Sequence, residues 1–253
     1  MSLHVERFGR GADLVLLHGW AQHSGAWDEV MPSLAERYRV HAVDLPGHGH
    51  SSGVSPTTLD DAVDQVASAI PGAAIVCGWS LGGLVAQRLA LLRPQRVRAL
   101  VLASATPCFV ERDDWRAAMK AETLQQFFDG LRVDCTSTLE RFVRLNALNG
   151  ARGREAMRAF SARLGSRGPP GVAALESALA WLRDTDLRGE VASIDAPAVV
   201  VHGSRDMLAP IEAGRWLAAS LRRARLVELP DCAHVPFFTH RDAFVAAVHS
   251  IDG

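Results

Sequence analysis

The sequence predicts an α/β fold in which a mostly parallel central sheet is flanked by helices and interrupted by an all-helical insertion. Two observations carry this prediction. Short continuous apolar runs alternate with helical patterns at both ends of the 253-residue chain, whereas a long stretch in the middle has no strand pattern. We therefore expect a core formed by residues 1–106 and 187–253, with residues 107–186 inserted as a helical cap segment.

The first part of the core contains one alternating stretch and four apolar runs. Residues 1–7 alternate in the manner of a strand, and a helical pattern covers 81–92. The apolar runs span 14–17, 40–43, 74–77 and 99–102. Continuous apolar runs of this length are typical of strands that are buried on both faces of a parallel sheet, so the helical patterns between them indicate β-α-β units.

The cap segment separates these strands from two more. Glycines interrupt its amphipathic helical patterns at four places, where we expect helices to end: 130, 150, 153 and 168–171. The runs at 198–201 and 225–229 then resume the strand pattern, and a helical stretch follows each of them. The parallel sheet is therefore predicted to continue after the cap segment.

The composition excludes several classes of protein. A net charge of −1 with 22% charged residues gives no general case for binding nucleic acid or a membrane surface. No apolar stretch reaches the roughly 18 residues of a membrane span, and the first residues lack the apolar region of a signal peptide. The four cysteines are scattered without a C-x-x-C pair, which argues against a disulfide framework or a zinc site. We expect a cytoplasmic protein that uses no metal and no cofactor.

The most informative motif is a G-x-S-x-G box, Gly78-Trp79-Ser80-Leu81-Gly82, directly after the apolar run 74–77. A serine hydroxyl is a weak nucleophile, so it must be held exposed beside a base and near donors for an oxyanion. A sharp strand-to-helix turn provides the exposure, and flanking glycines remove side chains that would collide in that turn. The motif predicts that Ser80 is a nucleophile.

An acid and a base follow Ser80 in the order that this chemistry uses. Asp206 lies just past the strand predicted at 198–201, and His234 lies just past the strand at 225–229. Both positions follow strand carboxyl ends, where open α/β sheets place their ligand crevice. His234 would accept the Ser80 proton and return it to the leaving alkoxide, while Asp206 would fix the imidazole tautomer. Asp184 and Asp231 are rival acids, but neither follows the strand that precedes the histidine strand.

Two backbone N–H groups are candidates for the oxyanion hole. One belongs to Leu81, immediately after the nucleophile, and the other to Trp20 in the turn after the strand at 14–17. Gly19 would allow that turn to be tight. Losing one such donor typically costs on the order of 100- to 1000-fold in rate.

Taken together, these segments resemble the α/β-hydrolase superfamily. The resemblance rests on LLHGW (16–20), VDLPGHGHS (43–51), GWSLGGLVAQ (78–87), ASATPCF (103–109), ERF (140–142) and AHVPF (233–237). More narrowly, the sequence is similar to the pimeloyl-[acyl-carrier protein] methyl ester esterases of biotin synthesis, and this similarity covers essentially the whole chain, cap segment included.

The resemblance implies hydrolysis of the methyl ester of a pimeloyl chain attached to an acyl carrier protein, without a cofactor, by a protein that we expect to be a monomer. It implies that Trp20, Ser80, Leu81 and His234 contact the substrate. It also implies that part of the cap segment lines an acyl tunnel: Phe142, Val143, Arg144, Leu145 and Asn146.

An arginine-rich stretch provides separate support for a carrier partner. Residues 140–167 contain seven arginines and two acidic residues, a net charge of +5. Arg154 and Arg158 are spaced to share a helix face, and Arg141 is the third residue that we expect to contact the carrier. Because acyl carrier proteins are acidic, a basic cap would steer one to the tunnel mouth. The alternative is a solvated helix face without a partner.

Two other functions stay open at this point. One is a general short-chain esterase, or a lyase or C–C bond hydrolase of the same fold, that acts on a free small molecule. The other is a ligand receptor without catalysis, because a fold does not determine a function. An intact triad with a complete oxyanion turn disfavours the receptor.

Overall fold

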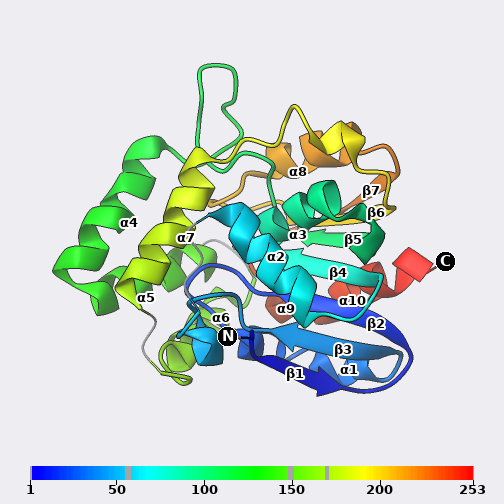
Figure 1. The fold of residues 1–253 in the computed structure, drawn as a ribbon. Coiled ribbons are helices and arrows are strands. Elements are labelled where there is room, and N and C mark those ends of the chain that lie inside the picture. Colours follow the sequence, from blue (N-terminus) through cyan, green and yellow to red (C-terminus); the bar gives the residue numbers. More distant parts are fainter. Residues whose placement is uncertain (1, 55–57, 148–150, 169–170, 253) are drawn as a thin grey trace.

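The chain forms a seven-stranded sheet in the order β1-β3-β2-β4-β5-β6-β7 (Figure 1). The structure, a computed structural model, describes residues 2–54, 58–147, 151–168 and 171–252. Strand β1 pairs with β3 in antiparallel orientation, and every other neighbouring pair is parallel, so the predicted mostly parallel sheet is confirmed. The strands are β1 (Val5–Phe8), β2 (Ala12–Leu17), β3 (Tyr38–Val43), β4 (Ala74–Trp79), β5 (Val97–Ala103), β6 (Ala198–Gly203) and β7 (Ala224–Leu229).

Both faces of the sheet are covered by helices, as the apolar runs predict. Side chains alternate between the faces: in β4, Val76 belongs to one hydrophobic cluster, whereas Ile75 and Cys77 belong to the other. The first cluster includes residues of α2 (Leu59–Ala69), α3 (Leu81–Leu92) and α8 (Ile211–Ser220). The second includes residues of α1 (Met31–Ala35), α9 (Pro236–Thr239) and α10 (Arg241–His249).

The cap segment runs between β5 and β6, and its described residues form four α-helices, which gather on one side of the sheet in Figure 1. They are α4 (Ala121–Val133), α5 (Cys135–Ala147), α6 (Gly153–Arg163) and α7 (Val172–Asp184). Over the described residues, no helix is long and apolar enough to cross a membrane.

The expectation that the cap segment is helical throughout is wrong for its first part. Residues 107–120 form a folded-back loop with isolated bridges between Val110 and Met119 and between Arg112 and Trp115. The backbone N–H of Met119 donates to the carbonyl of Phe109 at 3.0 Å. Because the backbone polar groups of this loop find partners in the loop itself, the chain satisfies them without a helix.

Gly130 also differs from the prediction, because it lies inside α4 and does not end it. A Cβ at this position would lie 2.5 Å from the hydroxyl oxygen of Thr138 on α5. The glycine therefore serves the close packing of two helices. At Gly153 the expected break between helices is present, and this residue is the first of α6. Gly150 lies outside the described residues.

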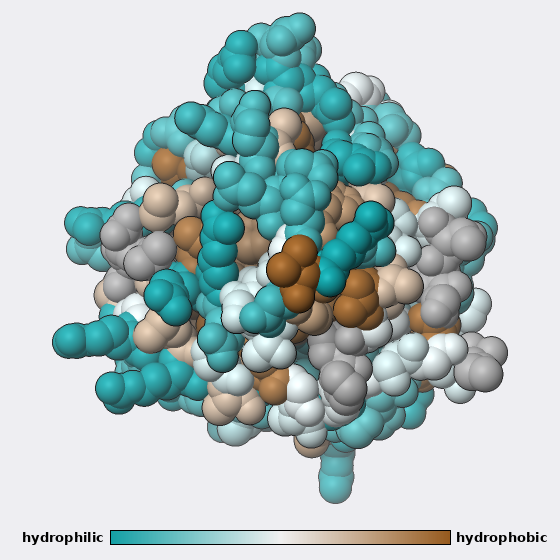
Figure 2. Space-filling model, turned by 90° about the vertical axis from the view of Figure 1, so that its left-hand side faces the viewer, coloured by the Kyte–Doolittle hydropathy of each residue, from teal (hydrophilic) through white to brown (hydrophobic). Residues whose placement is uncertain are grey.

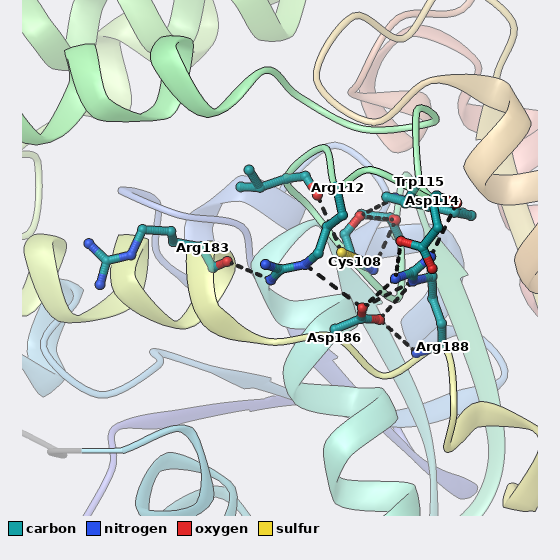
Figure 3. Close-up of polar contacts among 9 residues, drawn as sticks. Cys108, Arg112, Asp114, Trp115, Arg183, Asp186 and Arg188 are labelled. Carbon is teal, nitrogen blue, oxygen red and sulfur yellow. Dashed lines mark hydrogen bonds and ion pairs between the residues drawn. The ribbon is translucent and has the colours of Figure 1, made fainter.

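Asp186 joins the two ends of the cap segment (Figure 3). Its carboxylate accepts a hydrogen bond from the Arg188 guanidinium at 2.7 Å and lies 3.8 Å from Nε of Arg112, which belongs to the folded-back loop. Arg188 also reaches Asp114 in that loop at 3.1 Å. The Arg188 hydrogen bond, acting against burial, holds the pKa of Asp186 below its ordinary value. These contacts tie the start of the cap segment to its end.

We predict that Asp186→Asn lowers the free energy of unfolding by about 1–2 kcal/mol, because Arg112 then loses its carboxylate partner and Arg188 loses one of its two. Urea unfolding followed by circular dichroism measures the change. Asp195→Asn is the matched control, since Asp195 makes an exposed ion pair with Arg222 and should leave stability nearly unchanged. Equal losses in the two variants would contradict the prediction.

Candidate active site

Ser80 occupies a strained turn between β4 and α3. Its backbone has φ of 54° and ψ of −116°, a conformation that residues with a side chain rarely adopt. The turn is possible because Gly78 and Gly82 have no side chains: a Cβ on Gly78 would lie 2.2 Å from the carbonyl oxygen of Gly82, and one on Gly82 would lie 2.2 Å from that of Leu17. The backbone N–H of Ser80 donates to Ala103 on β5 at 3.0 Å. The sequence therefore places Ser80 at the predicted elbow.

Asp206 and His234 meet as the sequence predicted, in the loops after β6 and β7. The Nδ1–H of His234 donates to Oδ2 of Asp206 at 2.7 Å, since a carboxylate oxygen can only accept. The other oxygen of Asp206 accepts from the backbone N–H groups of Leu208 and Ala209 at 3.0 and 2.9 Å. Both side chains are fully buried.

The electrostatics of this pair keep Asp206 ionised. Burial by itself would raise the pKa of Asp206. The charge and the hydrogen bond of His234, together with the N–H of Ala209, outweigh burial and hold the pKa below its ordinary value. An ionised Asp206 fixes the proton of His234 on Nδ1, which leaves Nε2 as the nitrogen that can accept a proton.

Oγ of Ser80 and Nε2 of His234 are buried and have no hydrogen-bond partner among the described residues, and the same holds for Nδ1 of His202 beside Asp206. Buried polar groups are nearly always paired, so an unpaired group calls for an explanation. A nucleophile and its base are the atoms that an acyl-transfer site leaves open for the substrate.

The turn that carries Trp20 is held by the ring of His18. Its Nδ1–H donates to the carbonyl of Gly19 at 2.8 Å, and its Nε2 accepts from the backbone N–H of Leu45 at 2.9 Å. The backbone N–H groups of Trp20 and Leu81 donate to no other group in the described part of the chain. Both candidate oxyanion donors are thus free to bind an oxygen atom, and α3 approaches the end of β2 closely at Gly82.

The cap segment reaches this site through α5 and α7. The indole N–H of Trp20 donates to the carbonyl of Leu175 on α7 at 2.9 Å. Its ring meets the ring of Phe142 on α5 edge-on, with the ring centres 4.7 Å apart. The carbonyl of Asn146 on α5 accepts the backbone N–H of His234 at 3.2 Å. Both helices therefore contact residues of the candidate site directly.

The five consecutive residues expected to line a tunnel do not share one side of α5. Phe142 faces Trp20, and Val143 and Asn146 are buried. Leu145 is half-buried, whereas Arg144 is exposed. Successive residues of a helix are about 100° apart, so five in a row cannot all face one cavity. Arg144 belongs with the exposed arginines of the cap segment.

Backbone strain concentrates around the candidate site. Among the described residues, five that are not glycine have positive φ, and four of these lie in loops at the carboxyl ends of strands: Ala21, Ser80, Ser104 and Asp231. Residues in such conformations persist where the surrounding structure holds them, and they cluster at functional sites. The distribution marks the edge of the sheet at which Ser80, Asp206 and His234 lie.

Sequence reasoning missed two residues at this site. His202, at the end of β6, lies 3.6 Å from Asp206 and donates its Nε2–H to the carbonyl of Ala209 at 2.7 Å. Trp79 donates its indole N–H to the backbone carbonyl of His234 at 2.7 Å. Proximity to the motifs was the only sequence feature that could have indicated either residue. The contacts of His202 lie within seven residues, whereas the contact of Trp79 joins segments 155 residues apart.

The seven arginines between residues 140 and 167 fall into two groups. Three are paired with acids: Arg152 with Glu155, Arg163 with Asp28 and Glu29, and Arg167 with Glu6 and Asp44. The other four make no ion pair with a residue that the structure describes: Arg141, Arg144, Arg154 and Arg158. All four are exposed, so the positive charge of the cap segment is carried by α5 and α6. In the described ranges, no group of three or more His, Cys, Asp or Glu side chains could hold a metal ion.

Comparison with known proteins agrees with this geometry. The model of the alpha/beta hydrolase fold family matches residues 14–241. The pimeloyl-[acyl-carrier protein] methyl ester esterase of Nitrosomonas europaea is 44% identical over 251 residues, which cover 99% of each chain, and that of Nitrosospira multiformis is 41% identical over 98% of this chain and 97% of its own. An esterase from Exiguobacterium antarcticum has the same fold, with a TM-score of 0.88 at 23% identity over 99% of this chain and 96% of its own.

We predict that the protein loses stability as the pH falls from 7.5 to 5. Burial is the main cause that lowers the pKa of His18, His48 and His202 below the ordinary 6.5. A histidine with a lower pKa in the folded chain takes up its proton first in the unfolded chain, so each costs up to about 1.4 kcal/mol per pH unit below 6.5. Thermal unfolding across this range should show a falling Tm, and a constant Tm would contradict the prediction.

Proposed function

The chain belongs to the α/β-hydrolase fold family and, within it, to the family of pimeloyl-[acyl-carrier protein] methyl ester esterases, and from this premise we propose that it is a serine carboxylesterase that hydrolyses such a carrier-bound methyl ester. The product would be the free ω-carboxylate, released for biotin synthesis, together with methanol. The single observation that supports this most is the buried His234–Asp206 pair, 2.7 Å apart, which leaves Nε2 of His234 open beside the Ser80 elbow.

In the proposed reaction, Oγ of Ser80 attacks the ester carbonyl while Nε2 of His234 takes its proton. The resulting oxyanion would accept hydrogen bonds from the backbone N–H groups of Trp20 and Leu81. Collapse of this intermediate breaks the bond to the methoxy oxygen, which leaves as methanol with the proton from His234. Water then attacks the acyl-enzyme with His234 as the base, and Ser80 is released with its proton restored.

Residues 107–186 would act as the cap over this site. The support is direct contact: α7 accepts a hydrogen bond from Trp20, and α5 supplies Phe142 against the Trp20 ring and a carbonyl to His234. A long apolar acyl chain needs such a covered, apolar approach to the nucleophile. Phe142 and Trp20 are the pair that we propose to contact the acyl chain next to Ser80.

The carrier protein would dock on the exposed arginines of α5 and α6. Arg141, Arg154 and Arg158 support this part of the proposal, because their charges are not neutralised by described acids. Figure 2 shows the face that the cap helices cover, where long hydrophilic side chains surround smaller apolar areas. An acidic partner would be steered to such a face, while its acyl chain enters through the apolar part. A monomer in the cytoplasm completes the proposal, and the four free cysteines are consistent with a reducing compartment.

We predict that Ser80→Ala abolishes hydrolysis of p-nitrophenyl butyrate, with a loss of at least about 1000-fold in kcat, because no nucleophile remains. Release of p-nitrophenol measures turnover, and circular dichroism checks that the variant folds. Rescue of a biotin-requiring strain that lacks its own esterase tests the physiological reaction with the same two proteins. Undiminished turnover by the alanine variant would refute the triad, whereas turnover of small esters without rescue would favour a general short-chain esterase.

We also predict that the double reversal Arg154→Glu with Arg158→Glu lowers kcat/KM for the carrier-bound methyl ester about tenfold or more at low salt and leaves p-nitrophenyl butyrate unaffected. The matched control reverses Arg223 and Arg225, two exposed arginines at the opposite end of the sheet, beside and within β7, which make no ion pair with a described residue. Both double variants change the net charge equally. An equal effect of both on the carrier-bound ester would contradict docking at the cap segment.

A further inference from the structure

Trp79 touches all three segments that the proposed reaction uses. It precedes Ser80 in the chain, its indole N–H bonds the His234 loop, and its ring lies under the oxyanion turn. We infer that Trp79 is a positioning residue, which holds the His234 imidazole and the oxyanion turn in register with Ser80. This inference rests on the proposed function, because it assigns a role relative to the proposed triad.

A hydrogen bond ties the side chain of Trp79 to the loop that carries His234. The indole N–H of Trp79 donates to the backbone carbonyl of His234 at 2.7 Å, and both residues are almost completely buried. The backbone N–H of His234 donates in turn to the carbonyl of Asn146. Both backbone groups of His234 are thus hydrogen-bonded. Its N–H donates to the backbone carbonyl of Asn146, and its carbonyl accepts from the Trp79 side chain.

The indole ring of Trp79 also packs against the His234 ring and the turn at Gly19. The rings of Trp79 and His234 lie with their centres 5.8 Å apart. A Cβ on Gly19 would lie 3.0 Å from the Trp79 ring, so the oxyanion turn rests on this ring at van der Waals distance. Phe237, which follows His234 in the same loop, meets the ring edge-on at 5.0 Å. A shift of the indole would therefore move the base and the oxyanion turn together.

The consequence for catalysis follows from geometry. Catalytic groups must keep near-attack distances, and a displacement of 1 Å by a residue that does not touch the substrate can cost about 100-fold in rate. Asp206 orients the His234 ring through Nδ1, but it does not fix the main chain on which the ring is mounted. Trp79 performs that task, so its loss should slow the chemical step and leave binding of a small ester nearly intact.

Trp27 is a matched control in the same aromatic cluster. It is fully buried and packs against Phe237 with the ring centres 4.4 Å apart, close to the distance for Trp79. Its indole nitrogen has no hydrogen-bond partner among the described residues. Trp27→Phe therefore removes the same atoms from the same core as Trp79→Phe, but it removes no hydrogen bond to His234.

The experiment compares Trp79→Phe, Trp27→Phe and Ser80→Ala with the unchanged chain, using p-nitrophenyl butyrate well below each Tm. We expect Trp79→Phe to lower kcat about 10- to 100-fold with KM changed by less than about threefold, while Trp27→Phe keeps kcat within about threefold. Proton NMR provides the second readout. The downfield resonance of the His234 Nδ1 proton should broaden or vanish in Trp79→Phe and persist in Trp27→Phe.

Equal kcat values for the two tryptophan variants, or a change confined to KM, would overturn the inference. If Trp79→Phe does not fold, replacement of Trp79 by 3-benzothienylalanine, which keeps the ring shape and lacks the N–H, takes its place in both measurements. Ser80→Ala distinguishes a failure of the proposed triad from a failure of the inferred role of Trp79. Retained turnover in that variant refutes the proposed triad, whereas its inactivity together with equal tryptophan variants refutes the role of Trp79 alone.

Discussion

The close approach of the end of β2 to the start of α3 is the constraint on which the candidate site depends. Glycines at 78 and 82 let the backbone pass within a distance that no side chain would allow. The strained conformation of Ser80 is compensated by its neighbours: its N–H bonds β5, and its carbonyl accepts from Gly83 and Leu84 in the first turn of α3. The turn that holds Ser80 also brings Leu81 next to the Trp20 turn, so one backbone arrangement sets the conformation of Ser80 and the position of Leu81.

Burial gives this arrangement its chemical character. The side chains of Asp206, His202 and His234 are all inaccessible to solvent, where unpaired polar groups are costly. Asp206 has partners for both oxygens, and Nε2 of His202 bonds the carbonyl of Ala209. Among the buried atoms without a partner are the two that a substrate would engage, Oγ of Ser80 and Nε2 of His234. An ionised Asp206 held by fixed hydrogen bonds is preorganised for the charge that would develop on His234 during ester cleavage.

The cap segment contributes contacts to the candidate site. Carbonyl groups on α7 and α5 hold Trp20 and His234, and the loop after α6 is joined to the core through the ion pair of Arg167 with Glu6. Of the two helices that carry the unpaired arginines, α5 therefore contacts both His234 and Trp20. The proposed carrier-docking face is therefore linked through α5 to the backbone of His234, which also accepts the hydrogen bond of Trp79.

The sequence by itself determined the parallel strands of the sheet, because buried parallel strands require continuous apolar runs. It also determined the elbow, because a tight elbow requires glycine at fixed positions, and it selected Ser80, Asp206 and His234 as the candidate site residues. It did not determine the folded-back loop at 107–120 or the helical position of Gly130, because both depend on partners that leave no local pattern. Only the tertiary structure decided which arginines keep an unpaired charge and which indole donates to the backbone of His234. Trp79 and His234 are 155 residues apart in the chain, and a hydrogen bond over that distance exists only once the core has packed.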